Sequence, residues 1–527
     1  MDLEFEESAR KKLHSGLLKM YRAVGSTLGP SGQTVLIESN QHTQGMRVTK
    51  DGVTVARAIV LIDPIENLAV RIMRQAADRT GTLAGDGTST SVVLAYALIN
   101  AGQRLIDDTC NKTLVLKELV LETSKTIKHL ELGKRVVSDQ MVDHIASISA
   151  NNDTELGALI AKAYKDVGST GIVKVEDSDD HNTYSKVTDG LKVDRGYAKE
   201  SFVNDQEKDT WKAEDVMVIV SSTEINNIMV MEHVLSDVIK KKKKLLIIAP
   251  CTELVTMTLA ANNKRGSLVC CVVPPPHFGY KSKELMGDIA LALGATHFSE
   301  ETGDDMSIVR YEDLGSAKSV TVSKTDTVIV RGDKTDQSAV DQRLSELNKA
   351  LQRAKKQNDR DFILSRVASL SGGVGVIYAG GNTPMEQKEL YDRIDDAVCA
   401  VRAAREEGIV EGGGLALAKI ASTMTTTAED SIVNILAKEI LKEALVAPLN
   451  LILQNAGVTP IEAYPTGINN ETLGFDVKNN RKGDMIEMGV IDPFKVTKLA
   501  LENAVSVAVT ILSTSAIITM ARSYETS

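Results

Sequence analysis

Apolar side chains recur at helical spacing through the first 130 residues. The predicted helices cover residues 8–26, 65–79 and 92–105. In the second helix, Leu68, Ile72 and Met73 fall on one stripe, which we expect to face the core. Two short strands, 34–38 and 46–49, are predicted between the first two helices and are joined by a polar turn.

From about residue 190 to residue 373, short β-type runs alternate with helical segments. The β-type runs are 216–220, 245–249, 268–273 and 328–330, and the helical segments include 228–239 and 284–293. Strands that alternate with helices predict a compact α/β domain. Helical periodicity then returns in residues 385–406, 415–422 and 432–446.

This all-α, then α/β, then all-α order predicts a discontinuous fold, in which both ends of the chain form one helical domain and the middle is inserted. Two glycine points flank the predicted insert, at Asp189–Gly190 and Gly372–Gly373. Glycine tolerates the backbone changes that a hinge requires. An ordinary turn explains the glycines at each of these two places as well as a hinge does.

The chain has 527 residues, more than the ~100–200 of one domain, so we expect about three domains. Its formal net charge is −10, from 61 basic and 71 acidic residues. That balance argues against nucleic acid as a partner, because a binder needs clustered Lys and Arg side chains. The one dense basic run, residues 240–244, is interpreted as a solvated helix end.

No membrane or export segment is expected. The first residues lack the positive and apolar parts of a signal peptide, and the apolar stretch 504–520 contains Ser and Thr, which favours a buried helix over a membrane span. The five cysteines show no C-x₂-C spacing of a zinc site, and a disulfide framework is not expected in so long a chain. They are interpreted as reduced thiols of a cytoplasmic protein.

The strongest local signal for chemistry is the run from Gly85 to Thr90, Gly-Asp-Gly-Thr-Ser-Thr, directly before an apolar helix expected to begin at Ser91. Glycines let a ligand approach the backbone, and a helix start offers free N–H groups to phosphate. Asp86 would repel phosphate unless a cation bridged the two, so it predicts Mg²⁺. Pattern alone gives equal weight to a purely structural role, in which the Thr and Ser side chains cap the helix.

Three other loops carry glycine beside polar residues, and each is weak alone. They are Thr27-Leu28-Gly29-Pro30, Lys50-Asp51-Gly52 and Gly412-Gly413-Gly414. A helix end or a turn explains each of them individually. Asp396 lies on an otherwise apolar-striped helix, where Arg393 would be its ordinary partner. The P-loop pattern is absent, which argues against a conventional Walker ATPase.

The order and spacing of these motifs resemble the group I chaperonins of the GroEL type over almost the whole chain. The similar stretches are 27–30, 49–53, 84–88, 148–151, 194–197, 312–315, 402–404, 406–410, 412–414 and 488–493. Group I is favoured over group II because the middle of the chain has no long insertion for a built-in lid.

The resemblance implies a multidomain α and α/β fold with three domains. A helical equatorial ATP-binding domain would combine residues 1–131 and 407–527. A small intermediate hinge domain would combine 132–188 and 375–406. An α/β apical substrate-binding domain, 189–374, would be inserted between the discontinuous halves.

The resemblance also implies an ATP hydrolase. The residues expected to contact nucleotide are Thr27, Leu28, Gly29, Pro30, Lys50, Gly87, Thr88, Ser89, Thr90, Gly413 and Asp492. Asp86 would hold Mg²⁺, and a K⁺ ion near Thr27 and Lys50 is a further family expectation.

Two residues would be catalytic: Asp396 would orient the attacking water, assisted by Asp51. Positioning and charge neutralisation are most of what phosphoryl transfer needs. Asp153 and Arg393 preserve an ion pair of the family.

In the family an apical apolar groove binds non-native client proteins and the co-chaperonin. The corresponding positions are Tyr197, Phe202, Val234, Leu235, Met257, Ala260 and Ala261. Exposed apolar surface is costly unless it serves as an interaction site. Without the resemblance, ordinary core packing is favoured for each of these side chains.

The sequence departs from the family at several surfaces. Ser201 and Glu232 make the groove more polar, which leaves the need for a co-chaperonin open. At the ring–ring surface, residues 450, 459, 461 and 462 lack the usual charged and small side chains, which predicts a single heptameric ring. Asp476 and Val477 stand where the family has Asn and Ala beside the base.

The leading hypothesis is therefore an ATP-dependent chaperonin that forms homo-oligomeric rings and encapsulates client proteins. The alternative is a ring-forming holdase or scaffold with a vestigial ATPase, which the polar groove and the altered interfaces suggest. Retention of Asp51, Asp86 and Asp396 argues against that alternative. A small-molecule kinase using the same loops is disfavoured because no acceptor site is apparent.

Overall fold

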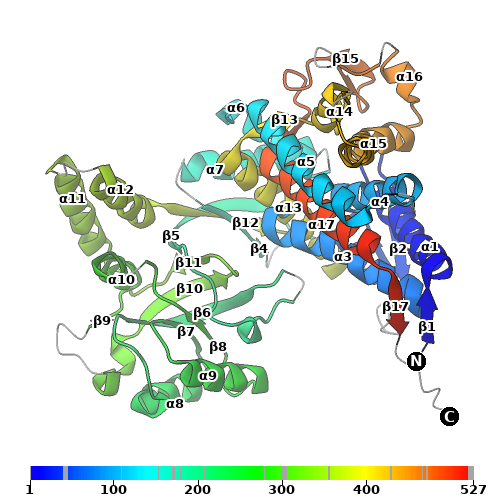
Figure 1. Ribbon diagram of the computed structural model, residues 1–527. Helices are drawn as coiled ribbons and strands as arrows, with labels where there is room; N and C mark the ends of the chain where they lie inside the picture. Colours follow the sequence, from blue (N-terminus) through cyan, green and yellow to red (C-terminus); the bar gives the residue numbers. More distant parts are fainter. Residues whose placement is uncertain are drawn as a thin grey trace. The chain divides into compact units, whose positions relative to one another are not determined.

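The computed structural model of the chain divides into two compact units (Figure 1). It describes residues 2–38, 46–107, 110–151, 153–168, 172–178, 181–206, 208–277, 279–299, 306–353, 357–427, 430–465, 467–469 and 473–519. Unit 1 comprises Met1–Ala161, Asp177–Asn182 and Ala379–Ser527, and unit 2 comprises Lys162–Glu176 and Thr183–Tyr378. Unit 1 thus draws on both ends of the chain. The finer division into three domains stays a prediction.

Unit 1 is mainly helical. Its helices are α1 (Glu6–Gly25), α2 (Gly52–Ala58), α3 (Pro64–Ala84), α4 (Thr88–Leu105), α5 (Lys112–Leu132), α6 (Asp139–Ser149), α13 (Pro384–Glu407), α14 (Leu415–Thr423), α15 (Ile432–Asn455), α16 (Pro460–Ala463) and α17 (Phe494–Ser513). Helix α7 (Thr154–Val167) begins in unit 1 and ends in unit 2. Four two-stranded sheets complete unit 1: β1 (Asp2–Phe5) with β17 (Ala516–Thr519), β2 (Val35–Glu38) with β3 (Met46–Thr49), β13 (Ile409–Glu411) with β16 (Ile491–Pro493), and β14 (Gly474–Asp476) with β15 (Arg481–Gly483).

Helix α17 is at the centre of the unit 1 core. It packs against α3, α4 and α5, and Leu501, Ala504 and Ala508 are fully buried. Among the described residues it is the one helix whose length and composition would allow it to cross a membrane, but more than half of its apolar window is buried inside the unit. The predicted helix 504–520 is therefore a core helix, as expected, but it ends at Ser513 and the chain continues as β17.

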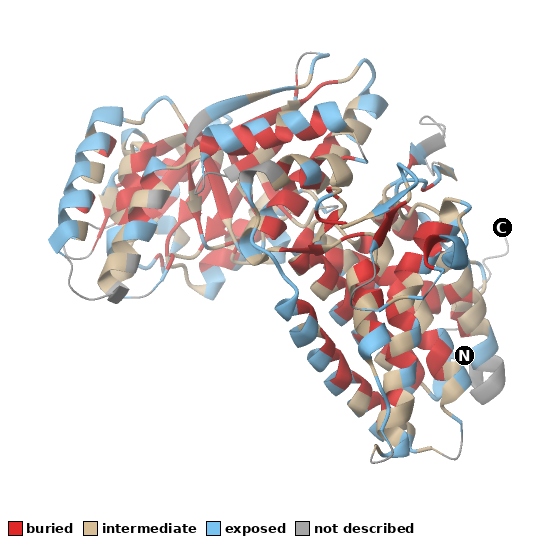
Figure 2. Cartoon of the chain, turned by 90° about the horizontal axis from the view of Figure 1, so that it is seen from above, coloured by how far each residue is buried: buried red, intermediate tan, exposed pale blue. Residues whose placement is uncertain are grey.

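The buried face of α3 differs from the predicted stripe. Met73 is fully buried as expected, whereas Leu68 and Ile72 are only partly buried. Alanines make up half of the buried residues of α3: Ala69, Ala76, Ala77 and Ala84. Small side chains let α4 and α17 pack closely against α3, so volume as well as hydrophobicity decides which face is inside. Figure 2 shows buried residues along the inward faces of the helices.

Unit 2 is built on a mixed sheet with the strand order β4-β12-β5-β11-β10-β6-β7-β8, and β9 pairs with β6. The strands are β4 (Ile172–Asp177), β5 (Tyr184–Val193), β6 (Trp211–Ser221), β7 (Lys244–Ile248), β8 (Cys270–Val273), β9 (His297–Phe298), β10 (Gly315–Val322), β11 (Thr327–Arg331) and β12 (Gly373–Ala379). The helices are α8 (Glu232–Lys240), α9 (Glu253–Arg265), α10 (Tyr280–Leu293), α11 (Gln337–Arg353) and α12 (Gln357–Ser371), with short 3₁₀ turns that include η1 (Glu200–Phe202) and η2 (Ile228–Met231).

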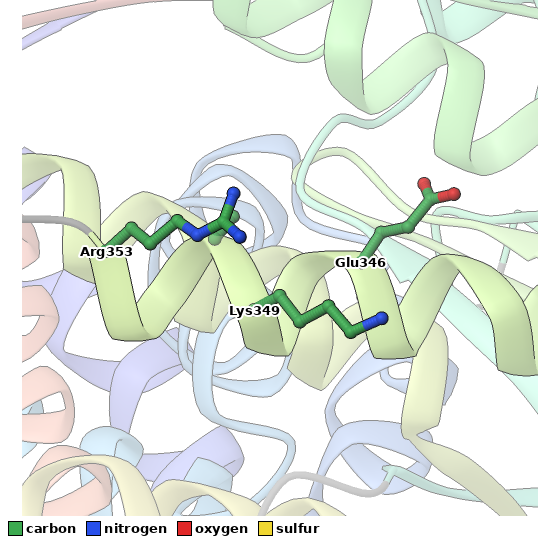
Figure 3. A pocket seen from close by; sticks show the side chains of 4 residues that line it. Glu346, Lys349 and Arg353 are labelled. Atoms are coloured by element: carbon green, nitrogen blue, oxygen red, sulfur yellow. The ribbon is translucent and has the colours of Figure 1, made fainter.

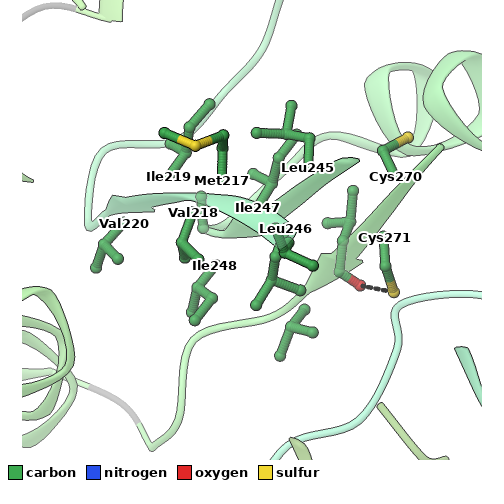
Figure 4. Packing of buried hydrophobic residues seen from close by; sticks show 14 of the residues in the cluster. Met217, Val218, Ile219, Val220, Leu245, Leu246, Ile247, Ile248, Cys270 and Cys271 are labelled. Atoms are coloured by element: carbon green, nitrogen blue, oxygen red, sulfur yellow. Dashed lines mark hydrogen bonds between the residues drawn. The ribbon is translucent and has the colours of Figure 1, made fainter. Parts of the chain in front are cut away.

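Strands β6, β7 and β8 are parallel, and their residues 216–221, 245–248 and 270–273 are buried, which explains the continuous apolar sequences there. Figure 4 shows side chains of β6 and β7 on both faces of the sheet, with Cys270 and Cys271 of β8 beside them on opposite faces. Burial raises the pKa of the Cys270 thiol to about 12, so this thiol is unreactive near neutral pH. None of the five cysteines, all of which lie in the described part of the chain, forms a disulfide bond.

The two glycine points are not turns. Asp189 and Gly373 are paired across β5 and β12, and Gly190 lies within β5 opposite Val330 of β11. A Cβ on Gly190 would come within 2.3 Å of Val374 Cγ2. Close strand packing therefore explains Gly190, and the turn interpretation is wrong there.

Candidate functional site

The run from Gly85 to Thr90 forms the junction between α3 and α4 in unit 1. Helix α4 begins at Thr88, three residues earlier than predicted, and its N-cap is Gly87 in the left-handed region at φ 81°. No side chain in the described part of the chain caps this helix start. The capping interpretation of the Thr and Ser residues is therefore wrong, and the N–H groups of the first turn remain available to a ligand.

Gly87 is required here for two reasons. Its positive φ disfavours other residues, and a Cβ at this position would come within 2.5 Å of Val496 Cγ1 on α17. The preceding Gly85, at φ 75°, ends α3 and donates its N–H to Gly81. Both glycines thus fix the chain direction at Asp86.

Three of the predicted loops meet at Ser89. Its hydroxyl lies 3.1 Å from Thr27 Oγ1, which itself donates to the Val24 carbonyl. A Cβ on Gly52 would lie only 2.2 Å from Ser89 Oγ. The loop after α1 and the loop before α2 therefore both contact the first turn of α4.

Asp51 is the N-cap of α2. Its carboxylate accepts hydrogen bonds from the Val53 and Thr54 N–H groups at 3.0 and 2.9 Å. The Thr54 hydroxyl donates to it at 2.6 Å. Lys50, immediately before it, is exposed. Asp51 is thereby held in one orientation beside the loop that carries Asp86.

Asn455 is a supporting residue that the motifs did not reveal. As the last residue of α15, it donates from Nδ2 to the carbonyls of Gly25 and Leu28, both at 2.9 Å. Gly29, at φ 85°, packs against Ile452 one turn earlier on α15. The conformation of the Thr27–Pro30 loop therefore depends on a helix more than 400 residues away in the chain.

Asp86 is surrounded by groups that fix it and by other carboxylates. The Gly87 N–H donates to Oδ1, and Ser149 Oγ at the end of α6 donates to Oδ2 at 3.2 Å. Burial and the nearby charge of Asp51 raise the pKa of Asp86, and these two hydrogen bonds partly oppose that rise. Ser149 lies in one of the stretches that resemble the chaperonins, but no motif predicted a role for it.

Asp492 belongs to the same group of charges. It lies on β16, paired with Val410 of β13, and the Gly413 N–H donates to its carboxylate. Burial, and then the charge of Asp86, raise the pKa of Asp492 to about 7. A buried carboxylate whose pKa is raised by the charge of a second carboxylate is a natural place for a cation, which would neutralise both.

The described residues contain no cluster of three or more His, Cys, Asp or Glu side chains that could hold a metal unaided. Mg²⁺ does not require one, since it commonly uses one or two carboxylates together with phosphate oxygens and water. Asp86, next to the uncapped start of α4, therefore fits Mg²⁺ that is bound together with a polyphosphate.

Asp396 lies on α13, which packs against α6 and α17 within unit 1. One turn further on, Cys399 contacts the Asp86 loop so closely that a Cβ on Gly85 would come within 2.1 Å of Cys399 Cβ. Residues three apart share a helix face, so Asp396 lies on the side of α13 that contacts this loop. Arg393 pairs with Asp153 at 3.8 Å and with Glu389, which confirms the predicted Asp153–Arg393 ion pair.

The predicted apolar groove in unit 2 is largely core. Five of its seven residues have at most 9% of their surface exposed: Tyr197, Phe202, Val234, Leu235 and Ala260. They belong to the hydrophobic cluster around Trp211, so the expectation that they form an exposed surface is wrong. The other two, Met257 and Ala261, are exposed.

Met257 and Ala261 share a face of α9 with Leu254, which is 72% exposed. These three residues, Leu254, Met257 and Ala261, are here called the α9 face. Their spacing of three and four residues produces a continuous apolar stripe on the helix surface. Met257 and Ala261 were predicted from the sequence as surface residues, whereas no motif indicated Leu254.

Two further sequence features have local structural roles. Asp476 accepts hydrogen bonds from Lys478, Asn479 and Arg481 and thereby builds the turn between β14 and β15. Thr459 and Glu462 form a capping box at the start of α16.

A hollow of about 510 Å³ beside α11 offers no alternative site. It is lined by Glu346, Lys349, Ala350 and Arg353. Figure 3 shows its three charged side chains spaced along this one helix. A ligand site needs polar groups that converge from several directions, and four residues of a single helix do not provide them.

The chain matches the model of the TCP-1/cpn60 chaperonin family over residues 20–522. Among solved structures it is similar to the chaperonin gp146 from the bacteriophage EL 2 (Pseudomonas aeruginosa), determined in the presence of ATP-BeFx. For crystal form II the TM-score is 0.71 at 21% identity, over 99% of this chain and 100% of that chain. For crystal form I the TM-score is 0.64 at 21% identity, over 99% of each chain. These matches confirm the predicted multidomain α and α/β architecture.

Proposed function

Because this chain belongs to the TCP-1/cpn60 chaperonin family, we propose that it is an ATP-hydrolysing chaperonin that assembles into rings, captures non-native proteins and encapsulates them while they fold. A folding function of the chaperonin type follows from the family.

The observation that carries the proposal is the start of α4. An uncapped helix N-terminus, which attracts anions, lies beside Asp86, Asp51 and Asp492, which repel them. A cation bound together with a phosphate chain removes this conflict, because it neutralises the carboxylates and leaves the N–H groups to the phosphate oxygens. MgATP is a ligand with both parts.

In this proposal Asp86 holds Mg²⁺, and the first turn of α4, Thr88–Thr90 with Gly87, holds the phosphates. Thr27–Pro30 and Lys50 line the nucleotide, K⁺ binds near Thr27 and Lys50, and Gly413 and Asp492 hold the nucleoside. MgATP would supply the transferable phosphoryl group and the charge that neutralises the carboxylates. The chain itself contributes fixed geometry, because the Thr27 and Ser89 hydroxyls are within hydrogen-bond distance and Gly52 packs closely against Ser89.

Asp396 orients and deprotonates the attacking water, and Asp51 assists it. The placement of Asp396 on the face of α13 that contacts Gly85 supports its role beside the water. The N-cap bonds of Asp51 limit that residue to an electrostatic and orienting contribution.

Client proteins bind at the α9 face. Hydrophobic contact is non-directional, so one apolar surface can hold many unfolded sequences. Tyr197, Phe202, Val234, Leu235 and Ala260 support this surface from the core instead of forming it.

The ring is proposed to be a single heptamer in the cytoplasm. Thr459 and Glu462 satisfy each other in a capping box, and Ile461 between them is 78% exposed, so this surface is not arranged for ion pairs across rings. Native mass spectrometry with and without nucleotide tests the ring, and fourteen-subunit particles alone would refute a single one.

The central experiment is steady-state ATPase activity with Mg²⁺ and K⁺, comparing the wild type with Asp396→Ala. We expect robust turnover that falls about 100-fold or more in the variant while nucleotide still binds. Glu389→Ala, on the same helix, is the matched control and should retain activity. No turnover in the wild type would favour the alternative, a ring-forming holdase or scaffold with a vestigial ATPase, which the polar groove and altered interfaces suggest. Asp51, Asp86 and Asp396 would then be structural residues only.

A further inference from the structure

A hydroxyl and an imidazole meet in unit 2, outside every surface discussed above. Ser222 Oγ and His297 Nε2 are 2.7 Å apart. Ser222 directly follows β6, and His297 opens β9. Val220 is opposite His297, and the Ser222 N–H donates to the Phe298 carbonyl at 2.8 Å, so the pair is fixed by strand pairing. Both side chains are partly exposed and open to a reagent.

The pair occupies a distinctive point of the sheet. Strands β8, β7, β6 and β9 are parallel neighbours in that order. The chain runs outward from β6 through β7 to β8 and then returns to β9 on the other side of β6. Right-handed crossovers place α8 and α9 on one face of the sheet and α10 on the other. The order therefore reverses between β6 and β9, and ligands of open α/β sheets bind outside the carboxyl ends of the strands at this reversal.

The neighbouring loops carry polar groups that lack partners. Ser221 Oγ accepts from the Thr223 N–H at 3.0 Å, and Ile225 ties the loop after β6 to the loop after β7. Thr223 Oγ1 and Thr252 Oγ1, one on each loop, are buried and without a hydrogen-bond partner in the described structure. Each such group costs about 1–3 kcal/mol, and a native protein retains them where something else satisfies them.

We infer that Ser222 is a nucleophile and His297 its base, in a site that accepts an acyl group from small activated esters. Ser222 Oγ attacks the ester carbonyl carbon, and its proton passes to His297 Nε2. The C–O bond to the leaving alcohol breaks, and the alcohol departs with that proton, leaving acyl-Ser222. Water, deprotonated by the same imidazole, then attacks the acyl group, which releases the carboxylic acid and restores the hydroxyl.

The test uses p-nitrophenyl acetate with the full chain in its assembled form. We expect a burst of p-nitrophenolate of about one equivalent per chain and an acetylated Ser222 peptide in mass spectrometry. Ser222→Ala should remove the burst and the label, and His297→Gln should slow acetylation about 100-fold. Ser267→Ala, an exposed serine of the same unit, is the matched control and should behave like the wild type.

Trp211 is the only tryptophan and is buried in unit 2, so its fluorescence checks that each variant is folded. Ser222→Cys provides a second route, because a thiol at this position should be acetylated in a His297-dependent way. Absence of a burst in the wild type, a burst that survives in Ser222→Ala, or labelling indifferent to His297 would each overturn the assignment.

Discussion

The start of α4 in unit 1 and the α9 face in unit 2 are suited to different kinds of ligand. At α4, the groups offered to a ligand are single atoms with fixed directions, set by the φ of Gly87, the Ser89 hydroxyl and the carboxylate of Asp86. At the α9 face, Leu254, Met257 and Ala261 offer apolar area without direction. A directional site should respond sharply to the change of one atom, whereas an apolar face should tolerate change and lose affinity gradually.

The largest expected effect comes from the support beneath the α9 face. Phe202 is fully buried in η1, which packs against α9, and its carbonyl accepts from Asn263 at 3.2 Å. Phe202→Ala should lower the free energy of unfolding by about 3–5 kcal/mol, because it leaves a cavity in the core. Urea unfolding followed by Trp211 fluorescence measures this loss.

The conservative change Phe202→Leu is the control and should cost less than about 1.5 kcal/mol. If Phe202→Ala were as stable as the wild type, Phe202 would lie at the surface. The predicted apolar groove that includes Phe202 would then be supported.

Asp86→Asn should separate stability from activity at the α4 site. We expect ATPase activity to fall about 100-fold or more, since a neutral amide holds Mg²⁺ poorly. Thermal stability without Mg²⁺ should rise, because the substitution removes a desolvated charge beside Asp51 and Asp492. Calorimetry in EDTA and ATPase assays measure the two effects. A variant that is both active and less stable would show that Asp86 is a structural residue.

The difference between these two regions also explains what the sequence could reveal. The helix from Thr88, the parallel strands β6 and β7, and the loops at Thr27 and Gly52 carry local patterns, and the structure contains all of them. The groove carried no such local pattern, because an apolar side chain in an α/β domain can face either inward or outward. Burial of Phe202 depends on α9 and η1 meeting in three dimensions.

Other failures have the same cause. Strand β17 pairs with β1 across the length of the chain, so periodicity near residue 516 could not indicate where α17 ends. Asn455 resembles any polar residue at a helix end until its contacts with Gly25 and Leu28 are known. The α3 stripe was misplaced because hydrophobicity ranks Leu68 above Ala69, whereas close helix packing prefers the smaller side chain.

The pH dependence of stability tests the interaction between Asp492 and Asp86. The pKa of Asp492 in the folded state is about 7, well above the ~3.9 of an unfolded aspartate. Between these values the folded chain holds a proton that the unfolded chain has lost, so this residue stabilises the fold at low pH and loses that contribution as pH rises through 7.

From pH 5 to pH 7, the wild type without metal should therefore lose up to about 1.4 kcal/mol per pH unit relative to Asp492→Asn. Denaturant titrations of both proteins in EDTA give the difference. If the free energies of unfolding of the two proteins changed with pH in parallel, Asp492 would be ionised in the folded state. The charge of Asp86 would then not raise the pKa of Asp492.

Gly52→Ala tests how closely the loops at α4 are packed. The new Cβ would lie 2.2 Å from Ser89 Oγ, so the Ser89 side chain must move and lose its contact with Thr27. Loss of one such hydrogen bond is worth about 0.5–1.5 kcal/mol, so the KM for ATP should rise up to about tenfold. The double variant Gly52→Ala/Ser89→Ala removes the clash with Ser89 Oγ and leaves Thr88 Oγ1 at 3.0 Å and the Cβ of residue 89 at 3.3 Å as the nearest atoms, so it should resemble Ser89→Ala alone. If the effects of the two substitutions on the KM for ATP were additive, close packing of Gly52 against Ser89 would not explain the effect of Gly52→Ala.

Met257→Ala should have the smallest effect on stability and completes the comparison with Phe202. Met257 is 53% exposed, so its loss should change the free energy of unfolding by no more than about 0.5 kcal/mol. Capture of a chemically unfolded protein should nevertheless weaken by a small factor, because each buried methylene of a client contact is worth about 0.8 kcal/mol. Light scattering of an aggregating client measures this, with Val255→Ala, a buried neighbour on α9, as the contrasting control. Loss of stability in Met257→Ala equal to that in Val255→Ala would put Met257 in the core, and the α9 face would no longer be a client surface.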